Sequence, residues 1–490
     1  MQDISIRQSI FQLNAEKNRP ASYITGAAKR PLTLLMFFSL AFLPLLVAGS
    51  EGYRIEVTVG GLAGETCYLA YHYGDRQFLR DTTMTDDKGF MVFEGSRRLD
   101  PGMYMVVLPG QQFFEILIDQ NQHFSLETSR DDAIEQMRFT GSPDNEAFYD
   151  YLRFIQGQRQ EMSHLREVLN NPETTAQDGE TARLGMDSLN AVIRQRQDAY
   201  IRDFPDGLFS LILLAQRDPE LPPESRHDDT AENPDFRRNL YIGNYWNNIR
   251  FEDDRILRTP VYHHQLRRYF GDLLHQIPDT IIRHADRVID KSRANPDVFR
   301  YTVWFLTSFT ERSQIMGMDA AYVHMLERYY GSGEAFWMEE AATRRLMERA
   351  EMLKPLLIGR KAPDITMYTP EGEPRSLHKL EATYVVLYFW ESDCVHCQRE
   401  TPALKELYGK YRDKGLEVFA ANTETNPDNW KGAISRYGLE WVNVHDPANR
   451  SGYRETYDIY AIPMIYLLDG EKRIVAKKIS VEQLERFLSF

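Results

Sequence analysis

The sequence predicts a multidomain protein with an N-terminal β-sandwich, an α-helical middle domain and a C-terminal α/β domain. Short alternating strands give way to helical periodicity near residue 141, and strands alternating with helices begin near residue 356. The length of 490 residues fits about three domains of roughly 150 residues each. We therefore expect domains over 51–140, 141–355 and 356–490, after a leading segment over 1–50.

Composition excludes several classes of protein. Hydrophobic residues make up 42% and charged residues 27% of the chain, which is typical of soluble globular domains. The net charge of -14 argues against nucleic-acid partners, because contacts to phosphates need clustered cations. Only three cysteines occur, so the chain is no disulfide-stapled scaffold.

The segment 1–50 has the layout of an export signal. An apolar, uncharged run over 32–48 follows Lys29 and Arg30 and ends in small residues beginning at Ala48. Because about 20 apolar residues span a bilayer, an uncleaved anchor in the inner membrane is the main alternative to a cleaved signal, and a buried helix is the remaining one. We expect an exported protein, with the segment either cleaved or kept as an anchor.

The range 51–140 alternates apolar and polar residues in short runs. The first run, Tyr53–Val59, is followed by a Gly-Gly turn, which predicts a half-buried strand. Regular short runs with turns between them predict a small antiparallel sandwich that ends near Thr140. Cys67 lies inside one of these runs, and we expect it to be a buried apolar residue. The further predicted strands are Cys67–Tyr71, Phe90–Phe93, Met103–Leu108 and Phe113–Ile118.

The range 141–355 shows helical periodicity, interrupted by a polar loop over 218–234. One apolar helical face is expected at Ile281, Ile282, Ala285, Val288 and Ile289. Histidines at 263, 264, 275 and 284 lack metal-binding spacing, so we expect solvated helix-face residues and no metal site. The pattern predicts no chemistry in this domain.

The range 356–490 alternates strands with helices and ends in a hairpin, which predicts an α/β domain. Strands are expected at 385–390, 416–421, 464–468 and 473–479. Helices are expected at 394–411, 427–437, 452–457 and 481–488.

Cys394 and Cys397 form a CxxC directly after the first of these strands, at the expected first turn of a helix. Unpaired backbone N–H groups and the helix dipole favour an anion there, so the thiolate of Cys394 is stabilised. One helical turn separates the two sulfurs, which permits a redox disulfide: Cys394 attacks a partner disulfide and Cys397 resolves the mixed disulfide. His396 between them adds positive charge near Cys394.

Three other uses of a CxxC fit less well. A zinc site needs two more ligands, and no second cysteine pair exists. Attachment of c-type haem needs His directly after the second cysteine, where Gln398 stands. A purely structural disulfide is the remaining alternative. We therefore expect redox activity without a metal or cofactor.

The segment from Phe389 to Pro402 resembles the active-site segment of thioredoxin-fold proteins, most closely the exported TlpA/ResA-like thiol-disulfide oxidoreductases. Trp390 stands four residues before the first cysteine, as in that family, and Pro402 matches the proline that kinks its helix. Ile462-Pro463 resembles the cis-proline loop, which faces the CxxC and pairs with the substrate backbone. The resemblance implies catalytic roles for Cys394, His396, Cys397 and Pro463, and client binding by Trp390, Ile462 and Pro463.

The chain also departs from that family. Asp393 replaces the usual Trp before the first cysteine, and Tyr388 stands where thioredoxin carries a buried acid. Glu424 lies about one residue from the position of a glutamate that assists ResA-like proteins.

The whole chain more loosely resembles multidomain exported thioredoxin-like proteins of Gram-negative bacteria. The resemblance implies a periplasmic thiol-disulfide oxidoreductase that exchanges disulfides with client proteins and draws electrons from a membrane or periplasmic donor. His396 favours an oxidant, whereas the family is mostly reducing. A thioredoxin-fold peroxidase is one alternative, although Leu387 and Glu391 replace the Pro and Thr of its signature. A scaffold protein with an accessory redox domain is the other.

Overall fold

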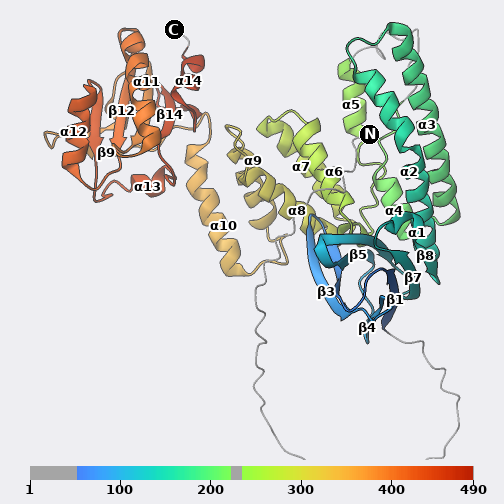
Figure 1. Cartoon of the computed structure of the whole chain (residues 1–490). Helices are drawn as coiled ribbons and strands as arrows, with labels where there is room; N and C mark the ends of the chain where they lie inside the picture. Colours follow the sequence, from blue (N-terminus) through green and yellow to red (C-terminus); the bar gives the residue numbers. More distant parts are fainter. Residues whose placement is uncertain (1–51, 222–233, 489–490) are drawn as a thin grey trace, which may run out of the picture. The chain divides into compact units, whose positions relative to one another are not determined.

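The computed structural model describes residues 52–221 and 234–488 (Figure 1). The expected signal or anchor over 1–50 and most of the expected loop over 218–234 lie outside these residues. The chain divides into two compact units. One comprises the residues up to Arg217 together with Arg255–Tyr262, and the other comprises Asp218–Asp254 and the chain from His263 onward. Within the described ranges, no helix combines the length and apolarity needed to cross a bilayer.

The first unit contains two four-stranded sheets, with strand orders β4-β1-β7-β8 and β3-β2-β5-β6. The sandwich predicted from the sequence is therefore present, and Thr140 ends its last strand. Cys67 is fully buried in β2, as predicted. The strands are β1 (Tyr53–Gly60), β2 (Thr66–Tyr73), β3 (Arg76–Met84), β4 (Phe90–Gly95), β5 (Gly102–Leu108), β6 (Gln112–Ile118), β7 (His123–Ser129) and β8 (Arg138–Thr140).

The sandwich is not wholly antiparallel, which corrects the prediction. β1 pairs in parallel with β7, from Arg54 opposite His123 to Gly60 opposite Ser129. Two adjacent parallel strands need a long connection, and the intervening strands supply it. The sequence pattern also missed β3, because this edge strand pairs only with β2 and its side chains are mostly exposed. Without a buried face, a strand has no alternating pattern to detect.

Two long helices of the first unit, α2 (Pro143–Asn170) and α3 (Ala176–Asp203), lie side by side (Figure 1). They bury a small apolar cluster that includes Leu165, Leu189 and Ile193. The apolar α4 (Leu208–Ala215) follows them and is almost completely buried.

The second unit begins with helices. On α7, Ile281, Ala285, Val288 and Ile289 are buried, which confirms most of the apolar face predicted from their spacing. The helices are α5 (Pro234–Asn244), α6 (Val261–Arg267, whose first two residues belong to the first unit), α7 (Pro278–Ser292), α8 (Pro296–Glu311), α9 (Asp319–Met325) and α10 (Glu340–Leu353).

The histidines of this region differ partly from the prediction. His264 and His275 are exposed, but His263 and His284 are half-buried and bind the hydroxyls of Tyr301 and Tyr269, each at 2.8 Å. Neutral imidazoles on a helix face can reach into the core when a hydroxyl is available as a partner.

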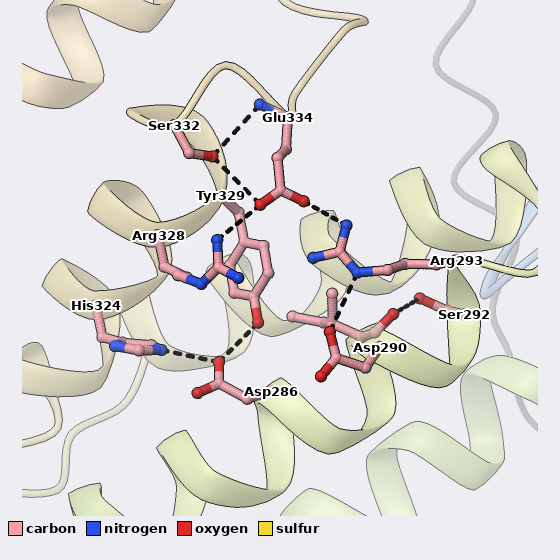
Figure 2. A network of polar contacts seen from close by, with 10 residues as sticks. Asp286, Asp290, Ser292, Arg293, His324, Arg328, Tyr329, Ser332 and Glu334 are labelled. Atoms are coloured by element: carbon pink, nitrogen blue, oxygen red, sulfur yellow. Dashed lines mark hydrogen bonds and ion pairs between the residues drawn. The ribbon is translucent and has the colours of Figure 1, made fainter.

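A polar network connects α7 to α9 and to the chain that follows α9 (Figure 2). Asp286 accepts hydrogen bonds from His324 at 2.8 Å and from the hydroxyl of Tyr329 at 2.6 Å. Glu334 pairs with both Arg293 and Arg328. Each carboxylate is thus already engaged by neighbouring donors, and the network acts to hold the helices together.

The C-terminal domain is built on a seven-stranded sheet with the order β10-β9-β13-β12-β11-β14-β15. The interior strand β11 runs parallel to β12 and antiparallel to β14. The strands are β9 (Thr366–Tyr368), β10 (Pro374–Ser376), β11 (Tyr384–Trp390), β12 (Leu416–Asn422), β13 (Val442–His445), β14 (Met464–Asp469) and β15 (Ile474–Lys477).

Successive residues of β11 point to opposite faces of this sheet. Val386, Tyr388 and Trp390 share one core with α11 (Val395–Tyr411), α12 (Pro427–Tyr437) and α14 (Val481–Leu484). Val385, Leu387 and Phe389 face a second core, which includes α13 (Tyr453–Thr456). Because helices cover a mixed sheet on both faces, the α/β class predicted for this domain is confirmed.

Candidate active site

Cys394 caps the N-terminus of α11. Its backbone is extended, and its sulfur accepts a hydrogen bond from the backbone N–H of Cys397 at 3.5 Å. The Cys394 carbonyl accepts the N–H of Gln398 at 2.9 Å and so begins the helix. A cap position gives a side chain access to N–H groups that have no partner within the helix, and these donors stabilise a thiolate.

Cys397 lies one turn inside the helix and is fully buried, whereas Cys394 is partly exposed. The pKa of the Cys397 thiol is raised to about 12, chiefly by burial; a backbone hydrogen bond involving Glu391 acts to lower it, and the neighbouring sulfur of Cys394 acts to raise it. Both cysteines are free thiols. The pair therefore combines one accessible sulfur with one that is kept protonated.

The Ile462–Pro463 peptide bond is cis, as predicted from the sequence. The loop that carries it lies against the CxxC, because the thiol of Cys394 is 3.8 Å from the carbonyl oxygen of Ile462. Ile462 and Pro463 are both half-buried. The fold thus brings two segments together that are separated by more than sixty residues in the chain.

Trp390 and Tyr388 support the site from beneath. Trp390 is 1% exposed and stacks on Tyr388 with ring centroids 6.1 Å apart. The Tyr388 hydroxyl lies 2.9 Å from that of Thr401 on α11. Burial, with the neighbouring Cys397 as a further cause, raises the pKa of Tyr388 well above its usual range. The role of Trp390 in client binding stays a prediction, since its side chain is covered.

His396 is exposed on the first turn of α11. Arg399 donates a hydrogen bond to its Nδ1 at 2.7 Å. A guanidinium can only donate, so Nδ1 is an acceptor in this pair. The first turn therefore carries the cation of Arg399 beside the imidazole.

A buried carboxylate fixes the turn before the CxxC. Glu424, which the sequence placed about one residue out of register, accepts the N–H of Ser392 at 2.8 Å and also the Ser392 hydroxyl. Asn422 at the end of β12 binds the second carboxylate oxygen at 3.2 Å. These bonds position the loop from which Cys394 follows.

Two exposed apolar side chains flank the site, and sequence reasoning missed both. Val395, directly after Cys394, is 67% exposed, and Tyr460, which leads into the cis-proline loop, is 79% exposed. No periodicity signals them, because exposure at a loop or a helix start depends on tertiary packing. Together with the partly exposed sulfur they form an apolar rim that another chain can contact.

The described residues contain no group of three or more His, Cys, Asp or Glu side chains placed to hold a metal ion. The arrangement is instead that of a dithiol. A partly exposed sulfur at a helix N-terminus can attack a disulfide, and the buried sulfur one turn away can displace the product.

Comparisons with known proteins point to the same chemistry. Residues 358–477 match the AhpC/TSA family. Over 134 residues the chain is 31% identical to the thiol-disulfide oxidoreductase ResA of Bacillus thuringiensis, which covers 27% of this chain and 76% of that protein.

Among solved structures, the thioredoxin domain of a thiol-disulfide oxidoreductase from Bacteroides vulgatus is 31% identical, covering 27% of this chain and 98% of that one with a TM-score of 0.26. A thioredoxin-like protein from Bacteroides caccae is 24% identical, covering 55% of this chain and 98% of that one with a TM-score of 0.46. The similarity to ResA shows that the chain belongs to the thioredoxin-like thiol-disulfide oxidoreductases.

Proposed function

We propose that the protein exchanges disulfides with client proteins outside the cytoplasm through Cys394 and Cys397. The observation that carries this proposal is the contrast between the two sulfurs. Cys394 is partly exposed at the helix N-terminus and faces the Ile462 carbonyl, whereas Cys397 is buried behind it.

The exchange has two steps. The Cys394 thiolate attacks one sulfur of a client disulfide, which forms a mixed disulfide and releases the other client sulfur as a thiolate. Cys397 then gives its proton to the released client thiolate, and its sulfur attacks that of Cys394, so the client leaves reduced and the Cys394–Cys397 disulfide forms. Two electrons pass to the client, and an electron donor of the membrane or periplasm restores the dithiol. A client dithiol drives the same steps backwards.

The cis-proline loop is the surface on which the client segment rests. Its half-buried Ile462 and Pro463 and the exposed Val395 and Tyr460 surround the reactive sulfur. Apolar side chains beside a reactive thiol favour an unfolded or extended client segment.

Trapping tests this mechanism. The full chain with Cys397→Ala should accumulate covalent mixed disulfides with client proteins, because the first step proceeds and the second cannot. The matched Cys394→Ala variant should accumulate few or none. Mass spectrometry of the trapped species identifies the linked cysteine. Equal yields from both variants would count against the assigned order of attack.

The direction of exchange and the peroxidase alternative have separate tests. Equilibration with glutathione gives the reduction potential of the couple, and a potential well below that of glutathione identifies a reductant. Consumption of hydrogen peroxide at a rate comparable to disulfide exchange would favour the peroxidase.

Export rests on the basic pair Lys29-Arg30 followed by the apolar run to Ala48. We propose a periplasmic location, with residues 1–50 removed or retained as an inner-membrane anchor. Cell fractionation checks it: the C-terminal domain should be found in the periplasm or on its membrane. Full-length protein in the cytosol with residues 1–50 still attached would contradict the proposal.

A further inference from the structure

A cavity of about 480 Å³ lies between the start of α11 and the cis-proline loop. His396 of the CxxC and Pro463 line it, together with Asp458 and Tyr460 from the chain that leads into the loop. Arg349 also lines it, and this residue belongs to α10, outside the C-terminal domain. A helix of the middle region therefore contributes to the surface beside His396 and the cis-proline loop.

Arg349 makes a two-pronged contact with that chain segment. Its guanidinium binds both carboxylate oxygens of Asp458, with Nη2 at 2.9 Å from Oδ2 and Nη1 against Oδ1. The Asp458 side chain is only 3% exposed. A forked ion pair of this kind fixes orientation as well as distance, and a buried carboxylate depends on it for its charge partner.

The same guanidinium also holds Tyr460. It lies 5.4 Å from the centre of the Tyr460 ring, and its Nη1 is 3.4 Å from the hydroxyl. Tyr460 is otherwise largely exposed, so this cation–π contact is a main restraint on its position. Three residues span at most about 10 Å, so fixing Tyr460 also limits the movement of Pro463.

The backbone of this segment needs such support. Asp458 has a φ of 55°, in the left-handed region that residues other than glycine adopt at a cost. A second ion pair joins the same two regions: buried Lys477 of β15 binds Asp319 of α9 and the carbonyl of Leu356. The C-terminal domain is thus tied at two places to the helices that precede it.

We propose that Arg349 is a positioning residue for client binding: from α10 it holds the Asp458–Tyr460 segment so that the cis-proline loop presents a fixed surface to an extended client peptide. This inference rests on the proposed function. Arg349 does not touch the sulfur, so it acts on how the peptide is bound and leaves the thiol chemistry to the dithiol.

The test compares two substrates of the full chain. One is a synthetic peptide of about ten residues that carries an internal disulfide, and the other is the small aromatic disulfide DTNB, which needs no peptide-binding surface. Arg349→Met should raise KM for the peptide about tenfold with little change in kcat, while the rate with DTNB changes less than about twofold. Arg349→Lys keeps the charge but loses the two-pronged contact. Its KM for the peptide should therefore lie between that of the wild type and that of Arg349→Met.

Arg345→Met is the matched control, since Arg345 is exposed on the same helix and the substitution removes the same charge. It should leave KM for the peptide unchanged. Tyr460→Ala removes the other partner of the contact between Arg349 and Tyr460. Because Tyr460 is exposed, this substitution should preserve the fold. It should raise KM for the peptide by a similar factor and add little to Arg349→Met in the double variant.

The outcomes distinguish a failure of the positioning role of Arg349 from a failure of the proposed disulfide exchange. An unchanged KM in both Arg349→Met and Tyr460→Ala overturns the positioning role. An equal loss with peptide and DTNB, carried by kcat, also overturns it, because the residue is then merely structural. A wild-type chain that reacts with neither disulfide overturns the proposed function itself.

Discussion

The N-terminal sandwich and the C-terminal domain each bury one cysteine completely. Cys67 lies on β2 and Cys397 on α11, and burial raises the pKa of the two thiols to about 11 and about 12. The difference between them is the neighbour. Cys397 has a second, partly exposed sulfur one helical turn away, whereas the sandwich holds no other cysteine. Burial alone therefore leaves a thiol protonated and unreactive. A buried thiol that lies beside a second sulfur at a helix N-terminus can still form a disulfide with it.

The largest expected effect comes from removing the exposed sulfur. Cys394→Ser should lower the rate of disulfide exchange at least about 1,000-fold, because no other thiol can reach a client disulfide. Cys67→Ser is the control and should change the rate less than about twofold. The measurement is reduction of a disulfide-bonded peptide followed by mass spectrometry. A large loss in the Cys67→Ser variant would break the comparison.

Alkylation of Cys394 should be about 100-fold or more faster than alkylation of Cys67 or Cys397. In the native, reduced protein, iodoacetamide should label Cys394 first between pH 6 and pH 8. Labelling of Cys67 and Cys397 should rise with pH and reach no plateau by pH 10, since the pKa values of both lie at about 11 or above. Peptide mapping after timed quenching measures each site. A plateau for Cys397 near pH 8.5 would show an ordinary thiol.

The same raised pKa values make stability depend on pH. A thiol whose pKa is higher in the folded state stabilises the fold fully below its unfolded value of about 8.5, and this contribution is lost as the pH approaches the folded value. Urea unfolding should therefore show stability falling between pH 8.5 and pH 10, and less steeply in Cys67→Ser. An equal slope in that variant would contradict the burial argument.

A fourth prediction concerns the attachment of the C-terminal domain. Asp319→Asn should lower the free energy of unfolding of the second unit by about 2 kcal/mol, roughly thirtyfold in the equilibrium constant, because it leaves the charge of buried Lys477 without its partner. Glu180→Gln, which breaks an exposed ion pair with Arg183 on α3, should cost less than about 0.5 kcal/mol. Urea unfolding measures both, and equal losses would contradict the difference.

The smallest effect is expected from removing the other regions. A chain of residues 356–490 should reduce DTNB within about threefold of the full-length rate, because both sulfurs and the cis-proline loop lie within it. Its folding is checked by circular dichroism. A folded chain that works at less than about a hundredth of the full-length rate would place part of the chemistry in residues 51–355.

Local patterns predicted the C-terminal domain well. Strand β11 begins one residue before its predicted start, and α12 has the predicted bounds. Buried strands and capped helices are encoded by neighbouring residues, so periodicity is enough. The three-residue strands β9 and β10 were missed because they are too short to show a period. The predicted last helix, Val481–Leu488, is α14 followed by a tighter 3-10 turn over Glu485–Phe487.

The sequence predicted those parts of the site that belong to short motifs. The cysteines and the cis-proline have fixed spacing and specific backbone demands, and so they can be recognised in the sequence. Arg349 could not be recognised. It is one arginine among several on α10, and it contacts Asp458 only because the fold joins segments more than one hundred residues apart. Long-range charge pairs leave no local pattern.

The parallel pairing of β1 with β7 sets the order in which the sandwich can assemble. The β2–β3 and β5–β6 pairs join strands that follow each other directly, so they can form early. β1 pairs with β4 along one edge, but its other edge has to wait for β7, because Arg54 pairs with His123 far along the chain. Until β7 is in place, that edge of β1 presents backbone N–H and C=O groups without sheet partners. The first strand of the described sandwich is thus among the last to have both of its edges paired.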